Sequence, residues 1–130
     1  MTNVWFHCGI CLLGEQAGEQ TFYVGKSFWS SSIIQRRVDD KEIKVPVKSF
    51  NQEVYKFNPT FLIVDIEGGE YEVFKNVDVD FHNIQKIVIE LHERVIGLEK
   101  VEVVISQFAA AGFQINKKFS ASEELFFQRH

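Results

Sequence analysis

The pattern of apolar and polar positions predicts buried strands alternating with helices over the second half of the chain. Residues 60–66 and 86–92 form two nearly continuous apolar runs of strand length, which is typical of strands covered on both faces. A short helix is expected between them at 69–76, and a longer helix at 98–111, where apolar residues recur three and four positions apart. Strands and helices in this order indicate a parallel sheet with right-handed crossovers.

A further helix is expected ahead of the first buried strand. Ser49 and Gln52 have the spacing of a capping box, which marks the start of a helix. Apolar residues then follow at helical spacing and predict one buried face, formed by Phe50, Val54 and Phe57. An Asn-Pro pair directly after the last of these residues stops the helix.

The first half of the chain is less regular. Residues 4–13 are continuously apolar apart from one histidine and predict a strand covered on both faces, and residues 20–24 predict a second strand. The segment 27–40 has no clear period, so we expect a loop or lid there. Residues 42–47 alternate like a strand, but Pro46 confines that strand to an edge or to a strand end, because proline cannot donate a ladder hydrogen bond.

The chain is expected to close with an antiparallel hairpin. Gly112 supplies the cap of the preceding helix, and residues 113–119 and 124–129 then alternate between apolar and polar positions. Together with the elements before it, this hairpin predicts an α/β fold whose sheet is mostly parallel with one antiparallel edge. No internal repeat or linker divides the chain, so residues 1–130 are expected to form a single domain.

Composition excludes several classes of protein. A hydrophobic content of 45% and an aromatic content of 14% are too high for a disordered chain. The net charge is −4 and the largest basic group is Arg36-Arg37, so nucleic acid is not an expected partner. The chain shows no secretory signal and no apolar run near the ~18 residues that cross a membrane, so we expect a cytoplasmic protein without membrane contact.

Polar groups follow the two buried runs at the point where each run ends. Asp65 and Glu67 come after the first run, and Glu90 and His92 close the second. Ligands of open α/β sheets bind outside the carboxyl ends of the strands, so these side chains are expected to converge on one crevice. They suit a divalent metal held by Asp65, Glu90 and His92, or a general base whose pKa is raised by its neighbours. Alternatively, Glu67 and Glu70 complement the dipole of the next helix and Glu90 ends its strand in solvent.

Cys8 and Cys11 have C-x-x-C spacing beside His7. A zinc site would need a second pair of ligands, and a thioredoxin-like redox site should open a helix after a βαβ unit. Neither context is present, so the favoured interpretation is two small apolar residues on a strand. The redox alternative predicts a reactive thiol with a lowered pKa. Four aromatic residues are interpreted as core rather than as a stacking surface: Phe22, Tyr23, Phe28 and Trp29.

The stretch LIVDIEGGEYEVF at residues 62–74 resembles the signature of the FkbM family of S-adenosylmethionine-dependent methyltransferases, roughly L-K-I-D-x-E-G-x-E-x-x-V-L. Phe74 stands where the family usually has leucine, and the matching residues are Asp65, Glu67, Gly68, Glu70 and Val73. Further stretches agree in the same order along the chain: LLGEQAGEQTFYVG, SSSI, VPVKSFNQEV, KIVIELH and AAGFQI. The resemblance therefore covers nearly the whole chain.

This resemblance implies a partial Rossmann-like methyltransferase sheet and transfer of a methyl group from S-adenosylmethionine to an oxygen, often a hydroxyl of a sugar or polyketide. It implies that Asp65 or Glu67, with His92 nearby, acts as base or orients the small-molecule acceptor, and that a divalent metal assists. The adenine side of the cofactor would lie near Ile10, Cys11 and Leu12.

Two departures from the family pattern change what is expected. The lysine that usually stands two residues before the aspartate is Ile63 here. The glycine-rich loop after strand one and the acid after strand two are missing, so the chain alone is expected to bind S-adenosylmethionine weakly or not at all. The sheet would expose the edge where strand one normally pairs, which predicts a homo-oligomer or a partner chain that supplies the missing half. The alternative is a non-catalytic binding or assembly module that keeps the fold.

Overall fold

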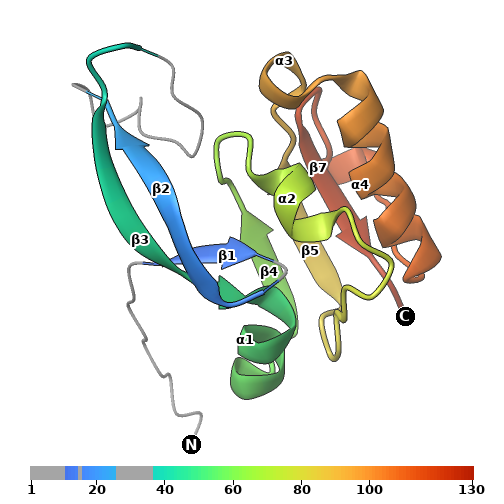
Figure 1. The fold of residues 1–130 in the computed structure, drawn as a ribbon. Coiled ribbons are helices and arrows are strands. Elements are labelled where there is room, and N and C mark those ends of the chain that lie inside the picture. The colour runs from blue at the N-terminus through green and yellow to red at the C-terminus, as the bar shows by residue number, and fades with distance from the viewer. Residues whose placement is uncertain (1–10, 15, 26–36) are drawn as a thin grey trace, which may run out of the picture.

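The computed structural model describes residues 11–14, 16–25 and 37–130. Their strands form two sheets, which lie side by side in Figure 1. The first sheet has the strand order β1 (Leu12–Gly14), β3 (Lys41–Ser49) and β2 (Gly18–Val24). β1 runs parallel to β3, whereas β2 runs antiparallel to it and forms a long two-stranded ribbon with it.

Two strands predicted in the first half of the chain are present where the structure describes it, although Leu13 of the first is 40% exposed rather than covered. β2 contains the strand predicted at 20–24, and β1 overlaps the end of the strand predicted at 4–13. The earlier residues of that predicted strand lie outside the described residues, and so do residues 27–36 of the predicted loop.

The prediction that Pro46 confines its strand to an edge or to a strand end is wrong, because Pro46 lies inside β3, which is the central strand of the first sheet. β1 pairs with β3 only from Val47 onward, while β2 pairs along the whole strand and places Glu19 opposite Pro46. At the proline, β3 therefore has one neighbouring strand rather than two among the described residues. A missing backbone N–H is tolerated at such a position because no second ladder has to be completed there.

The second sheet has the strand order β4 (Phe61–Val64), β5 (Lys86–Glu90), β7 (Glu124–Gln128) and β6 (Gln114–Ile115). β4 and β5 are parallel, as the helix between them requires, whereas β5–β7 and β6–β7 are antiparallel. The predicted antiparallel pairing at the C-terminus is confirmed, but the strand predicted at 113–119 is only two residues long, because Lys117–Phe119 form a 3₁₀ turn. The mostly parallel sheet is not confirmed, because the returning strand β7 lies between β5 and β6 and makes the sheet mixed.

Helices connect the strands of the second sheet. They are α1 (Phe50–Phe57), α2 (Glu70–Phe74), α3 (Glu93–Ile96) and α4 (Leu98–Ala110), and a 3₁₀ turn, η2 (Lys117–Phe119), precedes β7. α1, α2 and α4 confirm the three predicted helices, and α3 is an addition to them. Gly112 has a φ of +89° after the end of α4, which confirms the predicted cap. None of the described helices has the length and apolar character needed to cross a membrane.

The ends of α1 differ from the prediction in two details. Ser49 occupies the N-cap position, but its side chain makes no capping hydrogen bond, so the predicted capping box is not formed. Phe50 and Val54 are buried as predicted, whereas Phe57 is 47% exposed. Phe57 is the last residue of the helix, and the chain turns away directly after it through Asn58, which has a left-handed φ of +47°.

The hydrophobic core lies between one face of the second sheet and helices α2 and α4 (Figure 1). Ile87 and Ile89 of β5 are completely buried in it. Six phenylalanine rings contact one another there at centroid distances of 5.0 to 6.2 Å, mostly edge to face, and we call them the phenylalanine cluster: Phe50, Phe74, Phe81, Phe108, Phe113 and Phe127.

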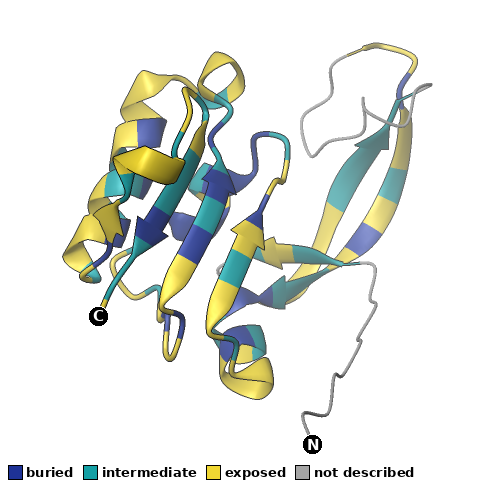
Figure 2. Ribbon diagram, turned by 180° about the vertical axis from the view of Figure 1, so that it is seen from behind, coloured by how far each residue is buried: buried dark blue, intermediate teal, exposed yellow. Residues whose placement is uncertain are grey.

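The opposite face of the second sheet is not covered in the same way. Figure 2 views this face and shows β4 and β5 without a helix in front of them. Phe61 and Ile63 of β4 point to it and are 48% and 70% exposed, while Val64 points into the core and is buried. The prediction that residues 60–66 form a strand buried on both faces is therefore wrong, because helices cover only one face of β4.

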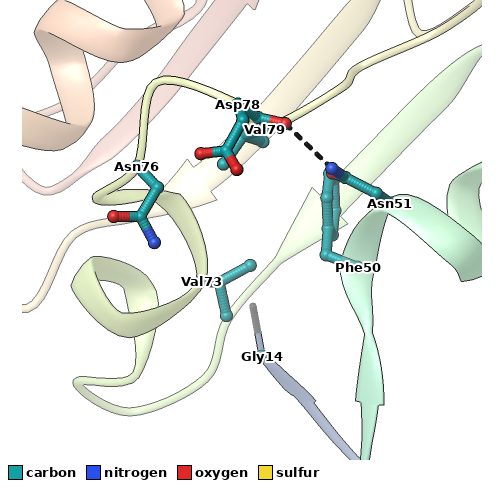
Figure 3. Close-up of a pocket in the computed structure, with 7 residues that line it drawn as sticks. All are labelled: Gly14, Phe50, Asn51, Val73, Asn76, Asp78 and Val79. Carbon is teal, nitrogen blue, oxygen red and sulfur yellow. Dashed lines mark hydrogen bonds between the residues drawn. The ribbon is translucent and has the colours of Figure 1, made fainter. Parts of the chain in front are cut away.

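The side chain of Asn51 ties α1 to the loop that follows α2 (Figure 3). Its amide nitrogen donates to the carbonyl of Asp78 at 2.8 Å, and its oxygen accepts from the backbone N–H of Asp80 at 2.8 Å. A cavity of about 40 Å³ lies beside this contact, between Gly14 and Val73. It is much smaller than the roughly 300 Å³ or more that a ligand pocket usually has, so it is too small to hold a cofactor.

Candidate functional site

The carboxyl ends of β4 and β5 bring together the residues that close the two predicted buried runs. The two strands are in parallel register, with Val64 opposite Ile89, so the next residues, Asp65 and Glu90, emerge side by side. His92 follows Glu90 by two positions and lies on the same side, because the residue between them is buried. Asp65, Glu90 and His92 therefore converge at this edge of the sheet, as predicted.

Glu67 also lies at this edge of the sheet, but the alternation of side chains along a strand does not explain its position. β4 ends at Val64, so Glu67 does not lie on an extended strand. Instead, Glu67 and Gly68 have left-handed φ values of +54° and +102°, and the backbone N–H of Gly69 donates to the carbonyl of Ile66 at 3.1 Å. This tight turn directs Glu67 toward His92, and glycine at position 68 makes the turn possible because it has no Cβ to clash.

Nε2 of His92 faces three carboxylates. It lies 3.9 Å from Oδ1 of Asp65, 3.7 Å from Oε2 of Glu67 and 3.8 Å from Oε1 of Glu90. We call these four residues the carboxylate–histidine cluster. The separations are too long for hydrogen bonds, but two ligands of one divalent cation lie about 3 to 4 Å apart. Ligand atoms of Asp65, Glu90 and His92 all lie within 4.8 Å of one another, which is the metal-ligand set predicted from the sequence.

Glu70 supports the cluster from beneath. It is the first residue of α2 and its side chain has no exposed surface. Its Oε1 atom lies 2.8 Å from Nδ1 of His92 and accepts the backbone N–H of Gly68 at 3.1 Å, whereas its Oε2 atom is buried without a hydrogen-bond partner. The interpretation of Glu70 as a complement to the helix dipole did not predict this contact. The position of Glu70 in the family signature was the one sequence signal that pointed to it.

The electrostatics of the cluster favour a bound positive charge. Burial alone would lower the pKa of His92, but the hydrogen bond to Glu70 and the negative charges of Glu70, Glu67 and Glu90 outweigh it and raise the pKa above its ordinary value. Partial desolvation and the charge of Asp65 raise the pKa of Glu90, against a smaller lowering effect of His92. The imidazole therefore retains its proton more readily than a free histidine does.

Of the predicted adenine-side residues, the structure describes Cys11 and Leu12, and Leu12 belongs to the first sheet rather than to the sheet that carries the cluster. Leu12 belongs to β1 and pairs with Val47 in the first sheet, and Cys11 precedes it as a half-buried free thiol. Ile10, His7 and Cys8 are outside the described residues, so the redox and zinc interpretations of the cysteine pair stay predictions. Of the four aromatic residues interpreted as core, Phe22 and Tyr23 are half-buried in β2, and the other two are outside the described residues.

Two larger hollows lie among the described residues, away from the carboxylate–histidine cluster. One, of about 300 Å³, lies between the β1–β2 turn and α2 and is lined in part by Gln16, Val47 and Lys75. The other, of about 170 Å³, lies beside His82 and Arg129. No residue of the carboxylate–histidine cluster lines either of them. The three carboxylate side chains of the cluster are 33% to 57% exposed.

Comparison with known proteins gives one finding. The model of the methyltransferase FkbM domain matches residues 11–115, which is most of the chain and ends at the last residue of β6. No curated protein and no solved structure matches the chain significantly.

Proposed function

Because the chain belongs to the FkbM methyltransferase domain family, we propose that it transfers a methyl group from S-adenosylmethionine to a hydroxyl oxygen of a small molecule such as a sugar. The family match supports methyl transfer in general. The finer proposal depends on one observation, the convergence of Asp65, Glu67 and His92 at the carboxyl edge of the second sheet.

The cluster has the groups that methyl transfer to a hydroxyl requires. The acceptor must lose its proton as its oxygen forms the new bond, and a carboxylate of Asp65 or Glu67, or the imidazole of His92, is placed to take that proton. When bound, S-adenosylmethionine supplies the methyl group, and the electron pair of the broken C–S bond stays on sulfur, which becomes a neutral thioether. The negative charge of the cluster suits both the sulfonium cation and the loss of the hydroxyl proton.

The described residues fit this cofactor only at its reactive end. They contain no glycine-rich loop after a first strand, and Leu12 lies in a different sheet from Asp65. Among the residues that the structure describes, no such loop is available for the part of the cofactor that carries methionine and ribose. We propose accordingly that the chain alone binds S-adenosylmethionine weakly and that a partner chain strengthens the binding.

A divalent cation is the second component of the proposal. Asp65, Glu90 and His92 offer two carboxylates and one imidazole, a ligand set that suits Mg²⁺ or Mn²⁺. Such a cation would polarise the acceptor hydroxyl and make its proton easier to remove.

Calorimetry with S-adenosylmethionine tests this function, together with transfer of a labelled methyl group to a panel of sugars. We expect weak binding by the folded chain and a loss of transfer in Asp65→Asn. Asp78→Asn is the matched control, because Asp78 is also exposed but lies in the loop after α2, outside the cluster. The proposal is contradicted if the folded chain binds no cofactor, or if Asp65→Asn transfers as well as the control does.

The exposed edge of β4 favours a second candidate, a binding or assembly module. Among the described residues β4 pairs only with β5, and its exposed side chains include Phe61 and Ile63. Edge strands of this kind associate with other strands, so we propose pairing with β4 of a second copy. Sedimentation should then detect a dimer that Ile63→Lys dissociates. A monodisperse monomer at high concentration would contradict this second candidate.

A further inference from the structure

Glu70 is the one charged side chain without exposed surface among the described residues. A carboxylate is costly to bury, and proteins retain one where its hydrogen bonds serve a purpose. Here one oxygen is used twice, by the backbone of Gly68 and by the ring of His92, and the other oxygen has no hydrogen-bond partner. A half-satisfied buried group of this kind calls for an explanation other than stability.

The contact with Glu70 decides which nitrogen of His92 faces the cluster. Oε1 of Glu70 accepts the N–H of Gly68, so we assign it as acceptor toward Nδ1 as well, at 2.8 Å. A neutral imidazole with its proton on Nδ1 presents a lone pair at Nε2. That lone pair points at oxygens of three carboxylates, 3.7 to 3.9 Å away, where a cation between them would join all four groups.

We infer that Glu70 is the positioning residue of a divalent-cation site, in which it holds His92 with Nε2 directed at Asp65 and Glu90. The inference rests on the metal component of the proposed function and deepens it. Histidines that bind metals commonly donate their other N–H to a carboxylate, which fixes the ring and makes the ligating nitrogen more basic. Glu70 has the burial and the contact that this role requires, although it does not itself face the cation.

Binding of Mn²⁺ alone to the full chain, followed by electron paramagnetic resonance, tests this inference. Glu70→Gln should weaken the affinity about 10- to 100-fold, because the ring loses the charged partner that orients it. Glu72→Gln is the matched control: Glu72 lies on the same helix but is exposed and pairs with Lys75 at 2.6 Å. It should bind Mn²⁺ as the wild type does. Circular dichroism of each variant establishes that it is folded, and Glu70→Asp, which is one methylene too short for the contact, replaces Glu70→Gln if that variant does not fold.

A second measurement needs no variant and reports the orientation directly. In the metal-free wild type at alkaline pH, nitrogen NMR of His92 should place the ring proton on Nδ1. A proton on Nε2 would overturn the inference, and so would a folded Glu70→Gln that binds Mn²⁺ as tightly as the wild type.

The outcomes separate this inference from the methyltransferase proposal. A wild type that binds no Mn²⁺ overturns both the inference and the metal component, while calorimetry with S-adenosylmethionine still decides the rest of the proposed function. Mn²⁺ binding by the wild type that is weakened in Glu70→Gln, together with no cofactor binding, supports the role of Glu70 and contradicts methyl transfer.

Discussion

The phenylalanine cluster and the carboxylate–histidine cluster belong to the same sheet but are built in opposite ways. The first contains six phenylalanine rings on the helix-covered face, and each ring contacts at least one other. The second contains ionisable groups at the carboxyl edge, held in place by a turn and by one partly buried hydrogen bond. Removal of a ring reduces the buried contact area and leaves a cavity, whereas removal of a carboxylate takes one negative charge away from the cluster.

This difference implies that stability and chemistry are carried by separate residues. Apolar packing depends on volume and burial, so changes in the phenylalanine cluster should lower the free energy of unfolding. Asp65 is 57% exposed in its side chain, so changes there should alter ligand binding and leave the fold intact. Stability and chemistry are coupled at Glu70 and His92, because the buried carboxylate of Glu70 depends on His92 for a hydrogen bond.

The largest expected effect on stability is that of Phe108→Ala. Phe108 is completely buried and its ring contacts Phe74, Phe81 and Phe127 at centroid distances of 5.0 to 5.3 Å. We expect a loss of about 3 to 5 kcal/mol in the free energy of unfolding, measured by urea denaturation. Phe119→Ala, at a position 65% exposed, is the control and should cost less than about 1 kcal/mol. Similar losses for both variants would contradict the conclusion that the phenylalanine cluster is the main source of stability.

Asp65→Asn should show the reverse behaviour. We expect the rate of methyl transfer to fall about 100-fold or more, because the cluster loses a base or ligand at the exposed end of β4. The free energy of unfolding should change by less than about 0.5 kcal/mol, because a carboxylate exposed to water adds little to stability. Denaturation and transfer are measured on the same preparation, and a large loss of stability would show that Asp65 is structural.

His92→Ala tests the point where the two regions are coupled. The variant leaves the buried carboxylate of Glu70 with the N–H of Gly68 as its remaining partner. We expect a loss of about 1 to 3 kcal/mol in the free energy of unfolding, in addition to the loss of Mn²⁺ binding. The double variant Glu70→Gln/His92→Ala should recover part of that stability, since the uncompensated charge is gone. Purely additive losses would mean that the hydrogen bond does not couple the two residues.

The smallest expected effect is a pH dependence of stability in the metal-free chain. The pKa of His92 is raised in the fold above its ordinary value of 6.5, so the folded chain binds the proton more tightly than the unfolded chain does. The resulting stabilisation is fully present below that ordinary value and is lost as the pH rises through the raised pKa. Urea midpoints from about pH 6 to about pH 9 should therefore fall with pH in the wild type. His92→Gln should lose this dependence, whereas His130→Gln, at the exposed end of the chain, should keep it.

Most of the elements from α1 to β7 could be predicted from the sequence in their correct order, with the exception of the short helix α3 and the 3₁₀ turn η2. The place where the ionisable side chains gather could be predicted as well. Helical spacing and apolar runs depend on neighbouring residues, so they are readable without the fold. The meeting of Asp65, Glu90 and His92 also followed from the sequence, because the carboxyl ends of adjacent parallel strands share one edge of a sheet.

Which surfaces those elements cover depends on the tertiary structure. It placed β3 in the centre of a sheet despite Pro46, and it left Ile63 exposed in a run that reads as buried. It also paired Glu70 with His92, 22 residues apart in the chain. Periodicity indicates which side of an element is apolar. Which segment covers that side, and which residue pairs with a buried charge, depend on contacts between segments that are distant in the chain, and no local pattern encodes such contacts.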